Sequence, residues 1–509
     1  MARSDQSPTP EDTADAADVA LPGLDHWFVR DLAGLYLEWQ PSPAPEPSLI
    51  ALNTSLAVEL GLDPSVLSTA DGLAVFAGNR VPNGAVPIAM SYAGHQFGGY
   101  SPRLGDGRAL LLGEVVLADG SRRDVHLKGS GRTPFARGGD GKAAIGPMLR
   151  EYLVAEAMHA LGVPTTRALA VAATGEYVMR DAALPGAVLT RIAASHIRVG
   201  TFEYAARLED RTAIVRLADH AIARHHPSAV TAANPYLALL ESVAEAQAAL
   251  IAQWMLVGFI HGVMNTDNMT ISGEGIDYGP CAFMDRYDPR TVYSSIDHGG
   301  RYAYGNQPNI AQWNLARLAE TLLSLIDDDP QAAVASATAV LEGFPARFDH
   351  HWQRGMRAKL GLPPTGDADG DRALFEGWLD LLGTHAADYT GSFRALAAVL
   401  RGDPSPLRAL LGDGDDVHQW LDTWRSRVAA DGDAAVERAD AMDRVNPLFI
   451  PRNHHLERVL AAATEGDITP FEEMLAVVTR PFEPQVGSEA YALPAPVEFA
   501  LAHQTFCGT

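Results

Sequence analysis

Cysteine is almost missing from this chain, in which only Cys281 and Cys507 occur among 509 residues. Because no Cys-x-x-Cys pair exists, the sequence excludes a cysteine-ligated zinc domain and a small disulfide scaffold. Long apolar runs are missing as well, since the most apolar stretch, residues 246–264, is interrupted by two glutamines and a histidine. That stretch therefore predicts a buried helix rather than a membrane span.

Basic residues are also scarce: 39 Lys and Arg stand against 63 Asp and Glu, which gives a formal net charge of −24. Such a surface repels phosphate backbones, so we expect no nucleic-acid partner. Residues 1–24 lack a basic start followed by an apolar run, and they predict a disordered acidic tail rather than a signal peptide. Apolar residues make up 47% and charged residues 20%, as in soluble globular proteins. We expect a cytoplasmic monomer without a membrane partner.

The pattern along the chain changes several times after the tail. Residues 25–90 mix short apolar runs with turn signals and predict an N-terminal extension packed on the next segment. Residues 91–202 are rich in glycine and alternating apolar positions, which indicates strands and tight turns around one helix, 144–163. Residues 203–330 and 331–509 favour helices. The expected fold class is α+β, in the two-lobe layout of protein kinases, with an N-terminal extension and helical C-terminal additions.

The segment "HGVMNTDNMTISGEGIDYGP", residues 261–280, looks like a kinase catalytic loop with one part removed. Kinases place an Asp shortly after the His, then an Asn, and then a metal-binding Asp-x-Gly. Asn268 and Asp277 are in place, but Val263 stands where the catalytic Asp belongs. Asn268 and Asp277 carry oxygen ligands of the kind Mg²⁺ prefers, and a tight hairpin would bring these two residues together. Asp267 is the loop carboxylate that could replace the missing base.

Lys128 lies at the end of an alternating segment, "DVHLKGSGR", that comes after a turn at residues 118–121. A lysine at a strand's end beside glycines can reach phosphate oxygens, although such a lysine taken alone is more often an ordinary surface residue. Glu151 lies in the next expected helix, where a kinase glutamate would hold the strand lysine in position. Alternatively, Glu151 forms a surface pair with neighbouring Arg150.

Two glycine-rich turns frame this strand, and each lets backbone N–H groups approach a phosphate. Neither matches the Walker pattern or the kinase glycine loop, so each alone is a weak signal. The residues concerned are Gly105, Gly107 and Arg108 in the first turn and Asp140 and Gly141 in the second.

Arg191 and Arg198 lie seven residues apart in "LTRIAASHIRVGTFEY". On a helix this spacing would place both guanidinium groups on one face, where they could bind a polyphosphate. Pairing with local carboxylates is the alternative.

The chain order of lysine strand, glutamate helix, metal-ligating loop and metal aspartate predicts a nucleotide-binding, kinase-like core. Two other functions remain open. An ordinary phosphotransferase is disfavoured by Val263, because it needs the missing Asp. A nucleotide-sensing scaffold without catalysis is disfavoured by retention of the complete metal and phosphate set.

Several long motifs together resemble the selenoprotein O family over roughly residues 25–509. They are "YAGHQFGGYSPRLGDGRALLLGE", "HLKGSGRTPFARGGDGKAA", "PGAVLTRIAASHIRVGTFE", "HGVMNTDNM", "DYGPCAFMD" and "NPLFIPRNHHLE". The resemblance implies a pseudokinase fold that binds ATP in a flipped orientation. It also implies transfer of AMP from ATP to Ser, Thr or Tyr hydroxyls of target proteins.

By this resemblance, Asp267 is the proton acceptor, Asn268 and Asp277 hold Mg²⁺ (or Mn²⁺), and Glu151 pairs with Lys128. The implied nucleotide contacts are Gly105, Gly107, Arg108, Lys128, Asp140, Gly141, Arg191, Arg198 and Asp277. The implied partners are ATP and protein substrates.

This sequence departs from the family pattern in two places. Lys142 stands where the family usually has an arginine after "GDG", which keeps the charge but loses bidentate geometry. Cys507 matches a redox-type residue near the family's C-terminus, but the usual cysteine partner is missing. We therefore hypothesise a regulatory disulfide between Cys281 and Cys507.

Overall fold

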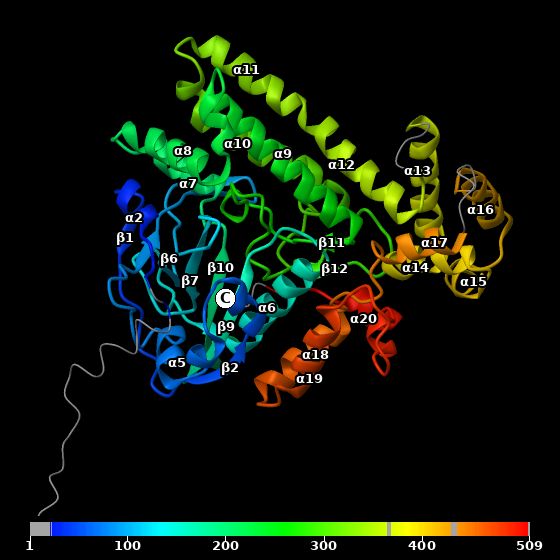
Figure 1. Cartoon of the computed structure of the whole chain (residues 1–509), viewed down its shortest axis with the longest axis horizontal. Helices are drawn as coiled ribbons and strands as arrows, with labels where there is room; N and C mark the ends of the chain where they lie inside the picture. Colours follow the sequence, from blue (N-terminus) through cyan, green and yellow to red (C-terminus); the bar gives the residue numbers. More distant parts are fainter. Residues whose placement is uncertain (1–20, 22, 364–367, 429–434, 507–509) are drawn as a thin grey trace, which may run out of the picture.

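The computed structural model describes residues 21, 23–363, 368–428 and 435–506. One antiparallel sheet and the helices around it form the N-terminal half (Figure 1). Its strand order is β1-β3-β6-β7-β10-β9-β2, with β8 paired to β10. In that order the strands are Tyr36–Glu38, Ile88–Met90, Ala109–Val116, Arg122–Lys128, Ala183–Ala193, Arg167–Met179 and Ser48–Leu52, and β8 is Ala143–Ala144.

Strands β6 and β7 form the hairpin expected around residues 118–121. Gly120 has a φ of 83° in the turn, a left-handed value that a residue without Cβ adopts without strain. Lys128, the last residue of β7, lies opposite Ala109 of β6 and Leu189 of β10. The lysine therefore sits at the end of a central strand.

Helix α6 (Ile145–Ala160) carries Glu151 and matches the helix expected at 144–163. Its residues are buried on nearly every side because β9 and β10 lie against it on one side and the C-terminal helices α18 (Asn453–Thr464) and α19 (Thr469–Val478) on the other. Gly162 lies just beyond it with a φ of 78°, a common helix ending.

The second half of the chain is mainly helical. Helix α9 (Pro235–Leu256) begins at Asn234, whose side chain accepts a hydrogen bond from the backbone N–H of Leu237. It packs against α10 (Gln307–Ile326) and α12 (Phe344–Lys359). It then leads into the short strand β11 (Phe259–Ile260), which pairs with β12 (Ala282–Phe283). The loop between these two strands carries Asp267, Asn268 and Asp277.

The remaining elements cover the edges of these two parts. The shorter N-terminal elements are α2 (Trp27–Asp31), α3 (Thr54–Glu59), α4 (Pro64–Leu67), α5 (Ala70–Phe76), β4 (Gly94–Gln96) and β5 (Gly99–Ser101). Further along are α7 (Val199–Ala205), α8 (Thr212–His225), α11 (Pro330–Glu342) and α13 (Ala368–Thr384). Last come α14 (Tyr389–Leu400), α15 (Ser405–Leu411), α16 (Asp415–Val428), α17 (Ala435–Asp443) and α20 (Val497–Ala502). Within the described residues, no helix combines the length and apolarity that a membrane crossing would need.

This mixture of one principal sheet with separate helices confirms the α+β class. Three strands from residues 25–90, the expected extension, belong to the same sheet as β6, β7 and β10. The expected acidic tail lies almost entirely outside the described residues.

One local expectation is wrong. Arg191 and Arg198 do not share a helix: Arg191 lies in β10, and Arg198 is the residue before α7. The run "AVLTRIA" is apolar and partly β-branched, which favours a buried strand over the helix that the spacing suggested.

Candidate functional site

A cavity of about 900 Å³ opens between the sheet, α6 and the loop after β11. It contains every site residue expected from the sequence. These are Gly105, Gly107, Arg108, Lys128, Asp140, Gly141, Glu151, Arg191, Arg198, Asp267, Asn268 and Asp277. The positions come from both halves of the chain, so the fold brings together residues that are far apart in sequence.

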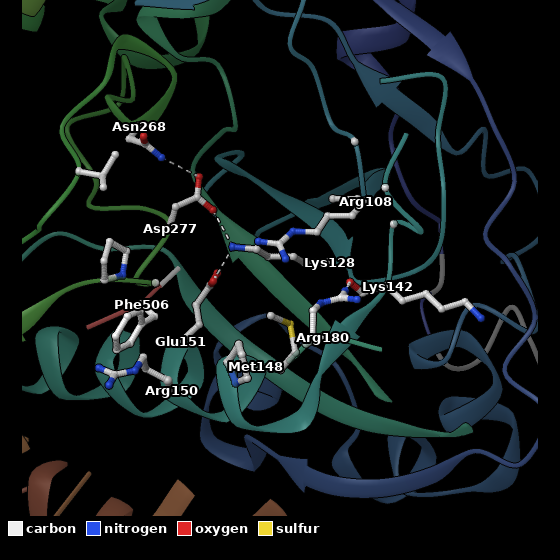
Figure 2. A pocket seen from close by; sticks show the side chains of 18 of the residues that line it. Arg108, Lys128, Lys142, Met148, Arg150, Glu151, Arg180, Asn268, Asp277 and Phe506 are labelled. Carbon is white, nitrogen blue, oxygen red and sulfur yellow. Dashed lines mark hydrogen bonds and ion pairs between the residues drawn. The ribbon is translucent and has the colours of Figure 1, made fainter. Parts of the chain in front are cut away.

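Lys128 occupies the centre of the site (Figure 2). Its Nζ lies 2.6 Å from Glu151 Oε2 and 2.7 Å from Asp277 Oδ1. Only 7% of Lys128 and 3% of Glu151 is exposed, so neither is the surface residue that the alternative interpretation allowed. The lysine therefore joins the sheet, α6 and the loop after β11 through one buried ammonium group.

Two arginines complete a cationic cluster around Asp277. The Nη2 atom of Arg191 lies 2.7 Å from Asp277 Oδ1 and 2.7 Å from Glu151 Oε1. The Nη1 atom of Arg198 lies 3.6 Å from Asp277 Oδ2, and the Arg198 Cζ lies 4.6 Å from the centroid of the Tyr92 ring. Burial alone would raise the pKa of Asp277, but these cations and Lys128 outweigh it and hold that pKa well below its usual value.

Both arginines have N–H groups available for a ligand. Three buried guanidinium nitrogens donate to none of the described residues: Nε and Nη1 of Arg191 and Nε of Arg198. Buried unpaired donors are costly, and an anionic ligand with several oxygens would satisfy them. The cluster is therefore suited to a polyphosphate.

Asn268 and Asp277 meet as expected from the loop's spacing. Asn268 Nδ2 lies 3.4 Å from Asp277 Oδ2, and Asp277 has a φ of 64°, a strained left-handed value for a non-glycine residue. Both side chains line the cavity, where they point toward each other (Figure 2).

The donor set around Asp277 fits a hard divalent cation. A carboxylate and an amide oxygen are ligands that Mg²⁺ accepts, once the amide of Asn268 turns its oxygen inward. Among the described residues, no group of at least three His, Cys, Asp or Glu could hold a metal by itself. A bound Mg²⁺ would thus need water or phosphate oxygens, as is usual for this ion with nucleotides.

Asp267 is 8% exposed and lies beside Asn268 at the cavity wall. Its Oδ2 accepts a hydrogen bond from Gln96 Nε2 at 3.1 Å, and its Oδ1 is buried without a partner among the described residues. Burial raises the pKa of this carboxyl to about 6. A carboxylate with such a pKa is a better proton acceptor than an ordinary surface aspartate.

The two glycine turns lie where a side chain would not fit. A Cβ at Gly105, with a φ of 92°, would come within 2.5 Å of the Phe135 ring. A Cβ at Gly141, with a φ of 71°, would lie 2.3 Å from the backbone of Arg132. Both turns therefore bring backbone close to the cavity without side-chain cover.

Asp140 occupies a more exposed position than the rest of the set. It forms an ion pair with Arg180, whose Nη1 lies 2.9 Å from Asp140 Oδ2. Lys142 is paired with Glu176 at 2.5 Å. These contacts place Asp140 and Lys142 at the rim near the β9–β10 hairpin.

Several cavity residues were not found from the sequence. Arg180 lines the cavity and lies outside every motif of the family resemblance. Gln96 and His126 also line it, and they lie within motifs of that resemblance, which assign them no role. Arg150 also lines it, donates to the Cys281 carbonyl at 3.2 Å and pairs with Glu457 of α18. The sequence indicates Arg150 only as an alternative partner of Glu151, because the motif that ends on Glu457 carries no sign of where its helix packs.

The hypothesised disulfide is not tested by this structure. Cys281 is fully buried, and burial raises the pKa of its thiol to about 12. Cys507 lies outside the described residues.

Such a site, in which a buried lysine–glutamate pair, a loop asparagine and an aspartate line a cation-rich cavity, is typical of nucleotide-dependent transferases. Comparison with known proteins makes this more specific. The family model described as "Protein adenylyltransferase SelO" matches residues 28–479. The chain belongs to this family, which confirms the resemblance drawn from the motifs.

Individual relatives agree with the family assignment. A "Protein nucleotidyltransferase YdiU" of Rhodococcus jostii is 56% identical over 503 residues, which cover 98% of this chain and 97% of the relative. A protein of the same name from Mycolicibacterium paratuberculosis is 59% identical over 486 residues, or 95% of this chain and 97% of the relative. A third protein of this name, from Cereibacter sphaeroides, is 57% identical over 487 residues, which cover 96% of this chain and 99% of the relative. The chain is thus a member of a nucleotidyltransferase enzyme family over nearly its whole length.

Proposed function

We propose that this protein transfers AMP from ATP to Ser, Thr or Tyr hydroxyls of other proteins and releases pyrophosphate. The observation that carries the proposal is Val263. An ordinary kinase needs an Asp at that position, yet the lysine, glutamate, asparagine and metal aspartate around it are intact and converge on one cavity. A phosphate-transferring enzyme would lack its base, whereas an AMP-transferring one can use a different carboxylate.

In this proposal, ATP lies in the cavity in a flipped orientation relative to kinases, so that its α-phosphate faces the loop of Asp267. Lys128, Arg191 and Arg198 bind phosphate oxygens, and the unpaired N–H groups of the arginines support this role. The glycine turns at 105–107 and 138–141 give the nucleotide backbone contacts. Arg108 and Asp140 also line the cavity, and in this proposal they contact the nucleotide as well.

The chemical step is consistent with these positions. The acceptor hydroxyl oxygen forms a bond to the α-phosphorus, the bond from the α-phosphorus to the bridging oxygen breaks, and pyrophosphate leaves. The hydroxyl proton passes to Asp267, whose raised pKa suits it to accept a proton near neutral pH. Arg191 and Arg198 neutralise the charge that develops on the leaving group.

Asn268 and Asp277 would hold Mg²⁺, or Mn²⁺ in its place, and the ion would neutralise phosphate charge and orient the phosphates. Glu151 keeps Lys128 in position. We also propose that the sheet with α6 and the helices around α9 correspond to the two lobes of a protein kinase. The protein would act as a cytoplasmic monomer without nucleic-acid or membrane partners.

The decisive experiment uses ATP labelled at either the α- or the γ-phosphate, with Mg²⁺ and a mixture of candidate acceptor proteins. We expect protein-bound label from α-labelled ATP only, and its loss in Asp277→Ala. Label from γ-labelled ATP only would instead indicate phosphate transfer. ATP binding with no label from either source would favour a nucleotide sensor.

A further inference from the structure

A short hairpin, β4–β5, lies directly on the loop that carries Asp267. Gly94 pairs with Ser101 and Gln96 with Gly99. The turn between them has two consecutive left-handed residues, Phe97 with a φ of 51° and Gly98 with a φ of 85°. Such a turn is tight and specific, so it sets the direction of the Gln96 side chain.

The hairpin backbone is bound to the loop at two points on either side of Gln96. The N–H of His95 donates to Thr266 Oγ1 at 2.7 Å, and the N–H of Phe97 donates to Asn265 Oδ1 at 3.0 Å. These backbone bonds fix the hairpin against residues 265 and 266, immediately before Asp267.

Glu203 of α7 and Tyr302 hold the same contact from behind. Thr266 Oγ1 donates to Glu203 Oε2 at 2.6 Å, and His95 pairs with the other Glu203 oxygen. Tyr302 OH donates to Asn265 Oδ1 at 2.6 Å. The hairpin and the loop therefore form one hydrogen-bonded unit.

Within this unit, Gln96 is the side chain that reaches Asp267. Its Nε2 donates to Asp267 Oδ2 at 3.1 Å. On the other side, a Cβ on Gly94 would lie 2.6 Å from Asp267 Oδ1, so the absence of a side chain there lets the carboxylate approach the hairpin. The carboxylate thus lies against the hairpin, with one oxygen hydrogen-bonded to Gln96 and the other close to Gly94.

We propose that Gln96 is a positioning residue for the transfer reaction: its side-chain amide fixes the Asp267 carboxylate in the orientation that meets the acceptor hydroxyl. The inference rests on the proposed function. In the step concerned, the acceptor oxygen bonds to the α-phosphorus, pyrophosphate leaves and the hydroxyl proton passes to Asp267. Gln96 exchanges no atom and acts only through the carboxylate.

The test compares Gln96→Ala and Gln96→Met with the wild type in steady-state AMP transfer. Methionine has nearly the length of glutamine but carries no N–H donor and no charge, so it keeps most of the packing while removing the hydrogen bond. We expect kcat to fall about tenfold or more in both variants, with KM for ATP unchanged within about twofold. Gly99→Ala is the matched control in the same hairpin, because a Cβ there meets only the Gln96 carbonyl oxygen at 3.5 Å.

A double-mutant cycle separates positioning from a general structural effect. In an Asp267→Asn background, Gln96→Ala should cause no further loss of the residual rate, because the group through which it acts has been changed. The proposal would be overturned if the rate losses of Gln96→Ala and Asp267→Asn multiplied in the double mutant. It would also be overturned by an unchanged kcat in Gln96→Ala, or by an effect on KM for ATP alone. If Gln96→Ala melts early, Gln96→Met decides. A wild type that transfers no AMP would overturn the proposed function and this role together, whereas an active wild type with an equally active Gln96→Ala overturns only the role.

Discussion

At the scale of single residues, the two cavity lysines differ sharply in their surroundings. Lys128 is buried between Glu151 and Asp277, whereas Lys142 lies at the rim in a partly exposed pair with Glu176. We expect Lys128→Met to lower AMP transfer by about 100-fold or more, because it removes a preorganised cation from the phosphate site. Lys142→Met should raise KM for ATP only a few-fold, since an exposed pair is worth about 1 kcal/mol or less. Steady-state kinetics of both variants check this, and equal losses would contradict the central role of Lys128.

Lys359 gives a second prediction at this scale. It is 4% exposed, its Nζ lies 4.0 Å from the Phe393 ring centroid, and burial lowers its pKa from the ordinary 10.5 to about 7. Between these values the unfolded chain binds more protons than the folded one, so stability rises with pH there. Below about pH 7 the amine is charged in the folded state too, and its burial then lowers the free energy of unfolding by the full cost of charging it there.

Replacing Lys359 by Met should therefore raise the free energy of unfolding by a few kcal/mol below about pH 7, and the gain should shrink as pH approaches 10.5. Denaturant unfolding of the variant and the wild type across this range measures the difference. Lys142→Met is the control, for which we expect no such trend. If Lys359→Met raised the free energy of unfolding equally at every pH, charging Lys359 would not be what destabilises the folded state.

At the scale of elements, Arg452 joins three segments of the C-terminal half. Its guanidinium contacts Asp285 Oδ1 at 2.6 Å, Asp388 Oδ1 at 2.6 Å and the Ala492 carbonyl at 3.0 Å. Asp388 also caps α14 through the N–H of Gly391. Because all three charged groups are buried, Arg452→Met should leave two unpaired carboxylates and destabilise the fold by about 3–5 kcal/mol.

Thermal and denaturant unfolding of Arg452→Met test this prediction. Arg401→Ala is the matched control, because Arg401 pairs with Asp440 and Asp443 at the surface and should cost about 1 kcal/mol or less. Similar losses in the two variants would mean that the buried cluster does not hold these elements together.

The elements also show how far sequence reasoning reaches. The β6–β7 hairpin and α6 are predictable from local turn and periodicity signals, and they place Lys128 and Glu151 correctly. The spacing of seven residues suggests the wrong element for Arg191, because it carries no information about the strand in which the residue lies. The motif that contains Gln96 gives it no role, because its partner Asp267 is 171 residues away, a contact that no local pattern reports.

At the scale of the whole molecule, the cavity draws its walls from the sheet, from α6 and from the loop between β11 and β12. Lys128, Arg191 and Arg198 converge on Asp277, and buried N–H groups of the two arginines have no partner among the described residues. A bound polyphosphate with Mg²⁺ would satisfy these groups and bridge both halves of the chain. Ligand binding should therefore stabilise the molecule as a whole rather than one segment.

We accordingly expect ATP with Mg²⁺ to raise the midpoint of thermal unfolding in a concentration-dependent way. At a ligand concentration of about 100 times Kd the gain is about 2.7 kcal/mol. The shift should be smaller with ATP alone, because Asp277 and the phosphates would then repel each other, and Mg²⁺ should add little to the shift in Asp277→Ala, because that variant lacks the metal ligand. Differential scanning fluorimetry measures all three, with Gly99→Ala as the control that should match the wild type. A wild-type midpoint that ignores ATP at millimolar concentration would contradict the assignment of this cavity to the nucleotide, since the cations that line it would then have no polyphosphate to bind.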